Sequence, residues 1–294
     1  MPAYTDQFEE AFYIYSYRFR NFLGALTDRQ LFQPMKINGD ADFVWRAFMT
    51  GLGSPARDDW TAGLPFCSIR LQLPDTRSIM NTAGKFGTPA LPSVVPTQGT
   101  GSFPFPMIPE VLLSKNSTLY ADLLSDIIGF TSAPFIDLRG VKLLKKGTRF
   151  TIPAGARYDT TPFTYWVPLD STQTAAGLRA VGTQSLTLDS DSDFLLYSIE
   201  GPNSFGSVQF RFFGPEGEET STVIDQGTPQ PGLISFSSLS GQGRFPGAIC
   251  PPMAYPAGGR ISYDYVIPAA GIFDTNVQYI GFRGAKLFSR KTYV

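Results

Sequence analysis

The 294-residue chain contains no histidine. This absence excludes catalytic systems built on a histidine base, such as the Ser-His-Asp triad and the Cys-His pair, and the zinc sites that histidine usually completes. A glycosidase that works with two carboxylates needs no histidine. However, the 25 acidic residues show no pair at the ends of adjacent predicted strands. The sequence therefore predicts a protein that is not an enzyme and that uses no cofactor.

Cysteine is nearly as scarce, since only Cys67 and Cys250 occur. They occupy non-equivalent positions in the repeat described below, so we expect two free, buried thiols and no disulfide framework. The chain has no uninterrupted run of 18 apolar residues and no secretory signal pattern, which predicts neither a spanning helix nor secretion. Its 24 basic residues balance the 25 acidic ones, so neither nucleic acid nor a membrane is expected as a partner.

What the chain does contain is a repeat. Residues 135–144 read FIDLRGVKLL and residues 279–288 read YIGFRGAKLF, so the pattern Arg-Gly-x-Lys-Leu occurs twice. Other motifs recur in the same order, namely Gly-x-Phe-Pro at 101–104 and 243–246, Asp-x-Asp-Phe at 40–43 and 191–194, and Ser-Ile/Val-x-Leu/Phe at 68–71 and 207–210. A repeat of this length indicates two tandem copies of one domain. We place the copies at residues 1–150 and 151–294.

Each copy is expected to consist of short strands and frequent turns. Glycine (29 residues) and proline (24 residues) are abundant, yet 43 % of the chain is hydrophobic, which argues against disorder. Residues 208–212 (VQFRF) and 260–266 (RISYDYV) alternate between apolar and polar side chains, as half-buried strands do. The sequence predicts an all-β fold of two tandem, internally duplicated antiparallel β-sandwich domains of a jelly-roll-like type.

Some segments are expected to depart from this pattern. Residues 118–128 fit a helix in the first copy only, and residues 8–11 are compatible with a short helix ahead of a strand at 13–20. Two stretches rich in Gly, Pro, Ser and Thr, at 51–65 and 84–101, are predicted to be long loops that reach partners.

The most distinctive candidate binding site is the acidic segment Asp189-Ser190-Asp191-Ser192-Asp193, which is related to residues 38–43 of the first copy. Acids at alternate positions are typical of calcium loops, but Phe194 stands where the EF-hand loop needs glycine. One interpretation is a cation site formed by Asp189, Asp191 and Asp193. The other, which we prefer, is an Asx-type turn whose side chains accept hydrogen bonds from backbone N–H groups, so no metal is predicted.

Two sets of residues are candidates for subunit contacts. Arg139 and Arg283 of the repeated motif could bind carboxylates of a neighbouring subunit. Alternatively, the glycine that follows each arginine marks a bulge or a close backbone approach, and the arginine faces solvent on the closing strand. Tyr13, Tyr15 and Tyr17 alternate along one predicted strand, which suits a sugar-binding platform, a subunit interface or a core.

The second copy also carries a resemblance. Phe245-Pro246, Pro251-Pro252 and the segment PAGGRISYD at 256–264, followed by QYIGFRGAKLF at 278–288, resemble virion structural proteins of tailed bacteriophages. The resemblance covers residues 190–294 well and the first copy less, because residues 114–118 replace the Pro-Ala-Gly-Gly turn. It implies a capsid decoration, collar, head–tail connector or tail protein, located in the virion and assembled in the cytoplasm of a bacterial host.

The sequence thus predicts a non-enzymatic virion structural protein. We expect it to be a homo-oligomer whose partners are copies of itself and other virion proteins. The rival hypothesis is a carbohydrate- or receptor-binding β-sandwich protein of a phage, in which the aromatic side chains of residues 13–17 stack on the ligand.

Overall fold

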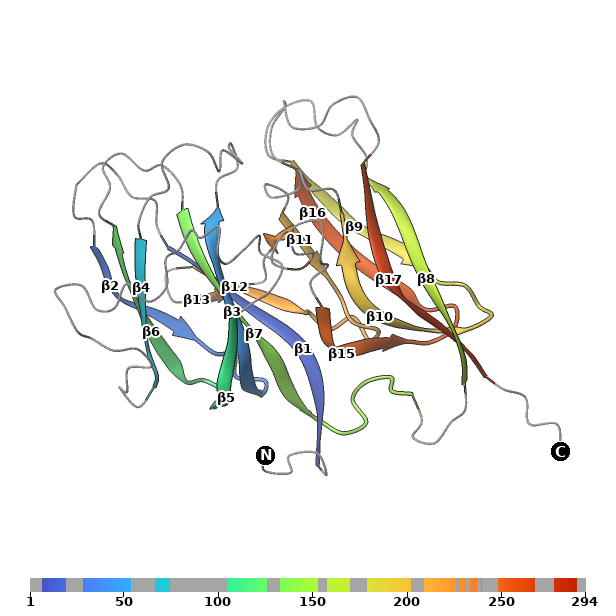
Figure 1. Ribbon diagram of the computed structural model, residues 1–294, viewed down its shortest axis with the longest axis horizontal. Helices are drawn as coiled ribbons and strands as arrows, with labels where there is room; N and C mark the ends of the chain where they lie inside the picture. Colours follow the sequence, from blue (N-terminus) through green and yellow to red (C-terminus); the bar gives the residue numbers. More distant parts are fainter. Residues whose placement is uncertain are drawn as a thin grey trace. The chain divides into compact units, whose positions relative to one another are not determined.

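The computed structural model describes residues 7–19, 29–53, 67–74, 105–125, 133–152, 158–169, 179–201, 209–225, 228–230, 233–236, 239, 248–267 and 278–289. These residues form seventeen β-strands (Figure 1). The strands are β1 (Phe8–Arg18), β2 (Arg29–Lys36), β3 (Asp42–Gly53), β4 (Cys67–Gln72), β5 (Phe105–Leu113), β6 (Thr118–Ser125), β7 (Ala133–Lys145), β8 (Tyr158–Leu169), β9 (Arg179–Thr187), β10 (Asp193–Glu200), β11 (Gln209–Phe212), β12 (Ser221–Asp225), β13 (Thr228–Gln230), β14 (Ile234–Ser235), β15 (Ala248–Tyr255), β16 (Arg260–Ile267) and β17 (Gln278–Ser289). The predicted all-β fold class is confirmed.

The strands belong to two compact units. One unit comprises Tyr13–Lys142 and Ser221–Ile234, and the other comprises Met1–Phe12, Leu143–Thr220 and Ser235–Val294. We call them the first and the second jelly roll. Compared with the expected division near residue 150, the start of the chain belongs to the second unit, and a short segment from the later half belongs to the first.

The second jelly roll contains two four-stranded sheets. One has the order β15-β10-β17-β8 and the other the order β14-β11-β16-β9. This alternation of early and late strands is what two Greek keys produce in a jelly roll. The sheets pack face to face, because the ring centroids of Phe210 on β11 and Tyr263 on β16 lie 6.4 and 5.6 Å from that of Phe282 on β17.

The first jelly roll has the same strand order. Strands β1, β7, β3 and β5 are successive neighbours in one sheet, and β2, β6 and β4 form the other. They correspond to β8-β17-β10-β15 and β9-β16-β11 of the second jelly roll. The arrangement agrees with the repeat in the sequence, while common descent of the two copies stays a prediction.

A hairpin from later in the chain extends the first jelly roll. Strand β12 pairs with β1 in parallel, from Ile14 opposite Ser221 to Arg18 opposite Asp225, and β13 pairs antiparallel with β12. The sheet therefore has six strands, in the order β13-β12-β1-β7-β3-β5. Among the described residues, β8, which corresponds to β1, is the last strand of its own sheet.

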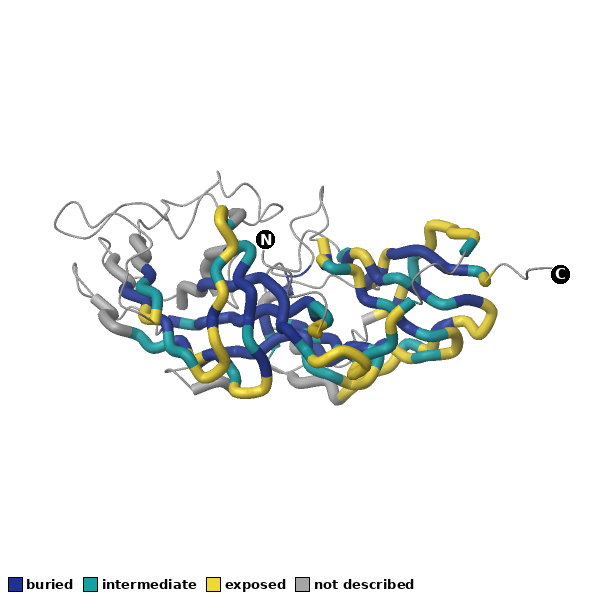
Figure 2. Tube along the Cα trace, turned by 90° about the horizontal axis from the view of Figure 1, so that it is seen from below, coloured by how far each residue is buried: buried dark blue, intermediate teal, exposed yellow. Residues whose placement is uncertain are grey.

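Alternating side chains of β1 form the centre of the core of the first jelly roll. Tyr13, Tyr15 and Tyr17 are buried together with Phe43 and Trp45 of β3. The rings of Tyr15 and Phe43 meet edge to face, with centroids 4.9 Å apart. Figure 2 shows buried residues running along the strands and exposed ones gathering at the turns. Burial of such large aromatic surfaces is the main source of stability for this sheet pair.

The prediction of a helix at residues 118–128 is wrong for residues 118–125, and residues 126–128 lie outside the described residues. Residues 118–125 form β6, the central strand of its sheet, paired with β2 on one side and β4 on the other. Leu119 and Ala121 are fully buried, whereas Tyr120 between them is exposed. The tertiary pairing outweighs local helix propensity here.

The other segments expected to depart from the strand pattern are described only in part. Residues 8–11 begin β1, so they are strand and not helix. Of the predicted loop at 51–65, only residues 51–53 are described, and they end β3. The rest of that segment and the predicted loop at 84–101 lie outside the described residues.

Candidate functional site

The two repeated motifs meet in each jelly roll. The Arg-Gly-x-Lys-Leu strand, β7 or β17, lies beside the strand that the Asp-x-Asp-Phe motif opens, β3 or β10. A Cβ atom on Gly140 would lie 2.0 Å from the carbonyl oxygen of Val44, and one on Gly284 would lie 1.8 Å from that of Leu195. The close backbone approach expected of these glycines is confirmed, and it explains why no larger residue stands there.

The lysine of each Arg-Gly-x-Lys-Leu motif is directed at acids in, or just before, the Asp-x-Asp-Phe motif. Nζ of Lys142 lies 2.7 Å from Oδ2 of Asp40, and Nζ of Lys286 lies 2.6 Å from Oδ2 of Asp189 and 3.3 Å from Oδ1 of Asp191. Both lysine side chains are largely buried, while the carboxylates are about half exposed. We call these arrangements the lysine centres.

An aromatic ring completes each lysine centre. Nζ of Lys142 lies 3.6 Å from the centroid of the Tyr13 ring, and Nζ of Lys286 lies 4.5 Å from that of Phe163. A cation over a ring face gains electrostatic energy, more so where water is excluded. The hydrogen bond from Lys286 to Asp189 raises the pKa of the lysine, so the ammonium stays charged at neutral pH.

A tyrosine next to each centre fixes the backbone in the same way. The hydroxyl of Tyr15 accepts a hydrogen bond from the backbone N–H of Asn38, and that of Tyr165 accepts one from Asp189, both at 3.2 Å. Burial raises the pKa of Tyr15 and of Tyr165. In both lysine centres, therefore, a neutral tyrosine hydroxyl in an equivalent position binds the backbone of the acidic segment.

The acidic segment is committed to internal contacts. Oδ1 of Asp193 accepts the backbone N–H of Ala257 at 2.9 Å, as Oδ1 of Asp42 accepts that of Lys115 at 2.8 Å. The hydrogen bond from Ser192 lowers the pKa of Asp191. The described residues contain no group of three or more acids or cysteines placed to hold a metal ion. The ammonium of Lys286 lies against Asp189 and Asp191, two of the three acids to which the alternative interpretation assigned a cation. Asp193 and Asp42 accept backbone N–H groups, as the turn interpretation expects, but the donors belong to distant segments and not to a local Asx-type turn.

Lys142→Met tests the contribution of a lysine centre. The substitution keeps an unbranched, apolar side chain but removes the ammonium and its contacts with Asp40 and the Tyr13 ring. We expect the free energy of unfolding to fall by about 1–2 kcal/mol in chemical denaturation. Arg46→Met is the control, because the side chain of Arg46, which pairs with Glu110, is more exposed than that of Lys142 and the loss of this pair should cost about 0.5 kcal/mol. Equal effects of both substitutions would contradict the assigned role.

The tyrosines proposed as subunit contacts are not accessible. Tyr13, Tyr15 and Tyr17 are 2 %, 0 % and 1 % exposed, and their rings face the core of the first jelly roll. Neither a sugar nor a neighbouring subunit can stack on them in this structure. Their alternation identified the strand correctly but could not show which side of it faces the core.

The two repeated arginines differ in their surroundings. Arg139 is 5 % exposed, and burial lowers its pKa to about 10. Arg283 lies on the solvent side of β17, where Nη1 is 2.7 Å from Oε1 of Glu200 and 59 % of the side chain is exposed. Only Arg283 is therefore available for a contact with another molecule, and Arg139 is part of the interior.

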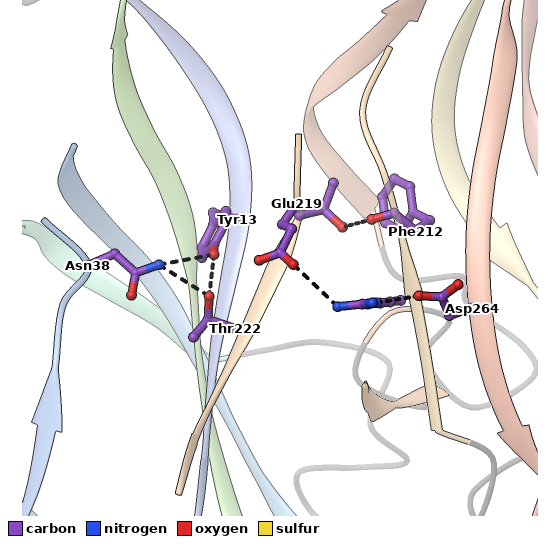
Figure 3. A network of polar contacts seen from close by, with 8 residues as sticks. Tyr13, Asn38, Phe212, Glu219, Thr222 and Asp264 are labelled. Atoms are coloured by element: carbon purple, nitrogen blue, oxygen red, sulfur yellow. Dashed lines mark hydrogen bonds and ion pairs between the residues drawn. The ribbon is translucent and has the colours of Figure 1, made fainter. Parts of the chain in front are cut away.

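A polar contact joins β12 to β1. The hydroxyls of Tyr13 and Thr222 are hydrogen-bonded to each other, and the side-chain amide of Asn38 donates to both, at 3.4 and 3.3 Å (Figure 3). The three side chains satisfy one another inside a largely apolar region. They fix the added strand in its register.

The second jelly roll has its own polar network on β11 and β16. Nε of Arg211 donates to Oδ2 of Asp264 at 2.6 Å, and Nη1 lies 3.3 Å from Oε1 of Glu219 (Figure 3). The guanidinium also lies 5.0 Å from the centroid of the Phe213 ring. Nearby, Thr220 donates to the carbonyl of Phe212 at 2.6 Å. These contacts hold the turn after β11 against the sheet.

Buried tyrosines predict a loss of stability in alkali. Burial, with a further effect of Tyr265, raises the pKa of Tyr263 to about 12 from an ordinary value of 10, and burial also raises the pKa of Tyr255. Below pH 10 the hydroxyl of Tyr263 is protonated in both the folded and the unfolded chain. Above pH 10 the unfolded chain loses the proton first, so the free energy of unfolding should fall as pH rises toward 12. Denaturation at several pH values should show this slope, and Tyr263→Phe should reduce it; an identical slope in the variant would contradict the assignment.

Sequence reasoning missed one exposed group. Trp166 on β8 and Tyr279 on β17 are 55 % and 46 % exposed. The six-membered ring of Trp166 lies over Gly281, since a Cβ atom there would be 2.9 Å from its Cζ3. The alternation of Trp166 with the buried Val167, and of Tyr279 with the buried Ile280, was a signal for this outward orientation.

Two further expectations concern cysteine and membrane spans. Cys250 is free, but it is exposed and not buried as expected, because it points outward from β15. The side chain of Cys67 lies outside the described residues. Within the described part of the chain, no helix has the length and apolar character of a membrane span.

Comparisons with known proteins give no family. Neither a protein-family model nor a curated protein matches the chain. Several solved structures show weak likeness, among them the following two. The ANXUR2 extracellular domain from Arabidopsis thaliana is 9 % identical over 96 % of this chain and 97 % of its own, with a TM-score of 0.19. The CBM22-1-CBM22-2 tandem domain of Paenibacillus barcinonensis Xyn10C is 7 % identical over 87 % and 82 %, with a TM-score of 0.15. Scores this low carry no argument.

Proposed function

We propose that the chain is a non-enzymatic virion structural protein that assembles through contacts with copies of itself and with other virion proteins. The observation that carries this proposal is the tandem pair of jelly rolls, a fold that serves in many viral capsid domains. Fold alone does not define function. The contacts that the repeated charged residues make are therefore the second support.

The repeated charged residues support a structural role. In both lysine centres the ammonium, the carboxylates and the tyrosine are bound to one another or to the backbone. A catalytic site instead needs groups that are positioned for a substrate. The resemblance to tailed-phage proteins adds the expected place, a capsid decoration, collar, head–tail or tail component assembled in the bacterial cytoplasm.

Incorporation into particles tests the proposal. Mass spectrometry of purified virus particles should find the chain in many copies, and mass photometry of the purified protein should show closed oligomers or larger assemblies. A low-resolution map of the particle would then give its position. A protein that is monomeric at every concentration and absent from particles would overturn the proposal.

A carbohydrate- or receptor-binding protein is the second candidate. The jelly roll also serves in lectins, and Trp166 and Tyr279 present aromatic surface to solvent. The tyrosines of β1, on which this hypothesis first rested, are buried. Glycan-array binding by the purified protein that is lost in Trp166→Ala would favour this candidate over assembly.

A further inference from the structure

The outer face of the sheet β15-β10-β17-β8 carries an unusual group of side chains. Trp166 is opposite Gly281, and Thr164 is opposite Arg283, in the register of β8 and β17. Since Ile280 and Phe282 are buried in the core, the residues that alternate with them face the other way. Trp166, Tyr279, Arg283 and its ion-pair partner Glu200 therefore share one surface, which we call the outer patch.

The corresponding residues of the first jelly roll are buried. Ser16, Asp137 and Arg139, which correspond to Trp166, Gly281 and Arg283, are 1 %, 0 % and 5 % exposed. In the second jelly roll, Trp166 is 55 % exposed and the Arg283 side chain 59 % exposed. Equivalent positions of the same fold are thus buried in one copy and exposed in the other.

We propose that the outer patch is the contact surface for a second copy of this chain. This inference rests on the proposed function and names a surface through which copies of the chain make contact. Trp, Tyr and Arg are the residue types that dominate the binding energy of protein–protein interfaces. A large aromatic surface beside a charged pair is the composition of such an interface, with a hydrophobic centre and a polar rim.

The charges select a copy of the same chain as the partner. The outer patch contains both members of an ion pair, with Nη1 of Arg283 2.7 Å from Oε1 of Glu200. A two-fold contact places the same patch on both sides of the interface. Arg283 of each copy can then approach Glu200 of the other, so the patch is complementary to itself.

The partner docks on the face and does not add a strand to the edge. Strand β8 ends its sheet among the described residues, but Pro162 and Pro168 stand opposite Ala285 and Tyr279 in the register with β17. Proline has no backbone N–H, and within a paired strand it is found where that N–H would point away from the neighbouring strand, toward the open edge. Both prolines therefore remove hydrogen-bond donors from the open edge of β8, which opposes strand addition there.

Charge reversal provides the sharpest test. R283E carries two acids in the patch and E200R carries two basic residues, so each variant alone should repel its own copy. Analytical ultracentrifugation should show self-association of the wild type, predominantly monomer for each variant, and recovered association when the two variants are mixed. Wild-type association in either variant alone, or a mixture that stays monomeric, would overturn the inference.

Aromatic truncations give an independent measurement. Trp166→Ala and Tyr279→Ala should each raise the Kd of self-association by about ten-fold or more, whereas Tyr120→Ala should leave it within about two-fold. Tyr120 is a matched control, because it is 38 % exposed on a strand of the first jelly roll. Unchanged unfolding midpoints would show that the variants fold. Loss of glycan binding in Trp166→Ala with unchanged self-association would assign the patch to a sugar and overturn the inference.

The inference and the proposed function can fail separately. If the wild-type protein is found in particles but its charge-reversal variants still self-associate, the proposed function is supported and the outer patch is not the contact surface. If the protein dimerises through the outer patch but is absent from particles, the contact surface is supported and the proposed function is contradicted.

Discussion

Replacing Gly284 by alanine is expected to lower the free energy of unfolding by about 3 kcal/mol or more. The added Cβ would lie 1.8 Å from the carbonyl oxygen of Leu195 and 2.7 Å from Cζ of the Phe194 ring. The first of these atoms belongs to the backbone of the neighbouring strand, so relief requires the strands to move apart. Chemical denaturation of the wild type and the variant measures the difference.

Two related substitutions make this prediction specific. Gly140→Ala should have a similar effect in the first jelly roll, because its Cβ would lie 2.0 Å from the carbonyl oxygen of Val44. Gly39→Ala should cost little, since the nearest atom is the end of the exposed Asn116 side chain, which can move. A loss of stability in Gly39→Ala as large as in Gly284→Ala would show that helical or strand propensity, and not the close approach, decides the effect.

Replacing Asp264 by leucine is expected to cost about 3 kcal/mol or more, because it leaves the guanidinium of Arg211 without its main partner. Asp264 is 8 % exposed, and the Arg211 side chain is 22 % exposed. The remaining contact of Arg211 with Glu219, at 3.3 Å, is longer and nearer to solvent. Thermal and chemical denaturation should both show the loss.

The double variant separates charge from packing. Arg211→Met combined with Asp264→Leu removes both charges and should recover much of the stability lost in Asp264→Leu alone. Glu219→Gln serves as a surface control and should change stability by less than about 1 kcal/mol. A double variant as unstable as Asp264→Leu would mean that the loss comes from packing and not from an unpaired charge.

Local patterns in the sequence predicted the parts of the fold that depend on neighbours along the chain. The alternation in β1 and β16 identified strands, and of the bulge or close backbone approach expected at the glycine of each Arg-Gly pair, the close approach is present. The repeated motifs indicated a duplication, but not that the lysine of one motif binds acids in or beside the other, which only the structure shows. The successful predictions follow from periodicity and from matched spacing.

What could not be predicted depends on distant partners. Residues 118–125 have a local pattern that suits a helix, and only pairing with both β2 and β4 makes them a strand. The β-branched residues Thr222, Val223 and Ile224 favour a strand, but nothing near them indicates β1 as the partner. The two repeated arginines show the same limit, because equal motifs have one buried and one exposed arginine.

The parallel pairing of β12 with β1 constrains the order of events during synthesis. Tyr13 and Thr222, which are hydrogen-bonded across these strands, are 209 positions apart in the sequence. Strand β1 is therefore translated long before its edge partner β12. Domains usually fold one after another from the amino terminus. Here the first jelly roll is completed only by Ser221–Ile234, which follow much of the second jelly roll in the sequence. A nascent chain stalled near residue 150 would expose the edge of β1 to other chains, a setting in which aggregation competes with folding.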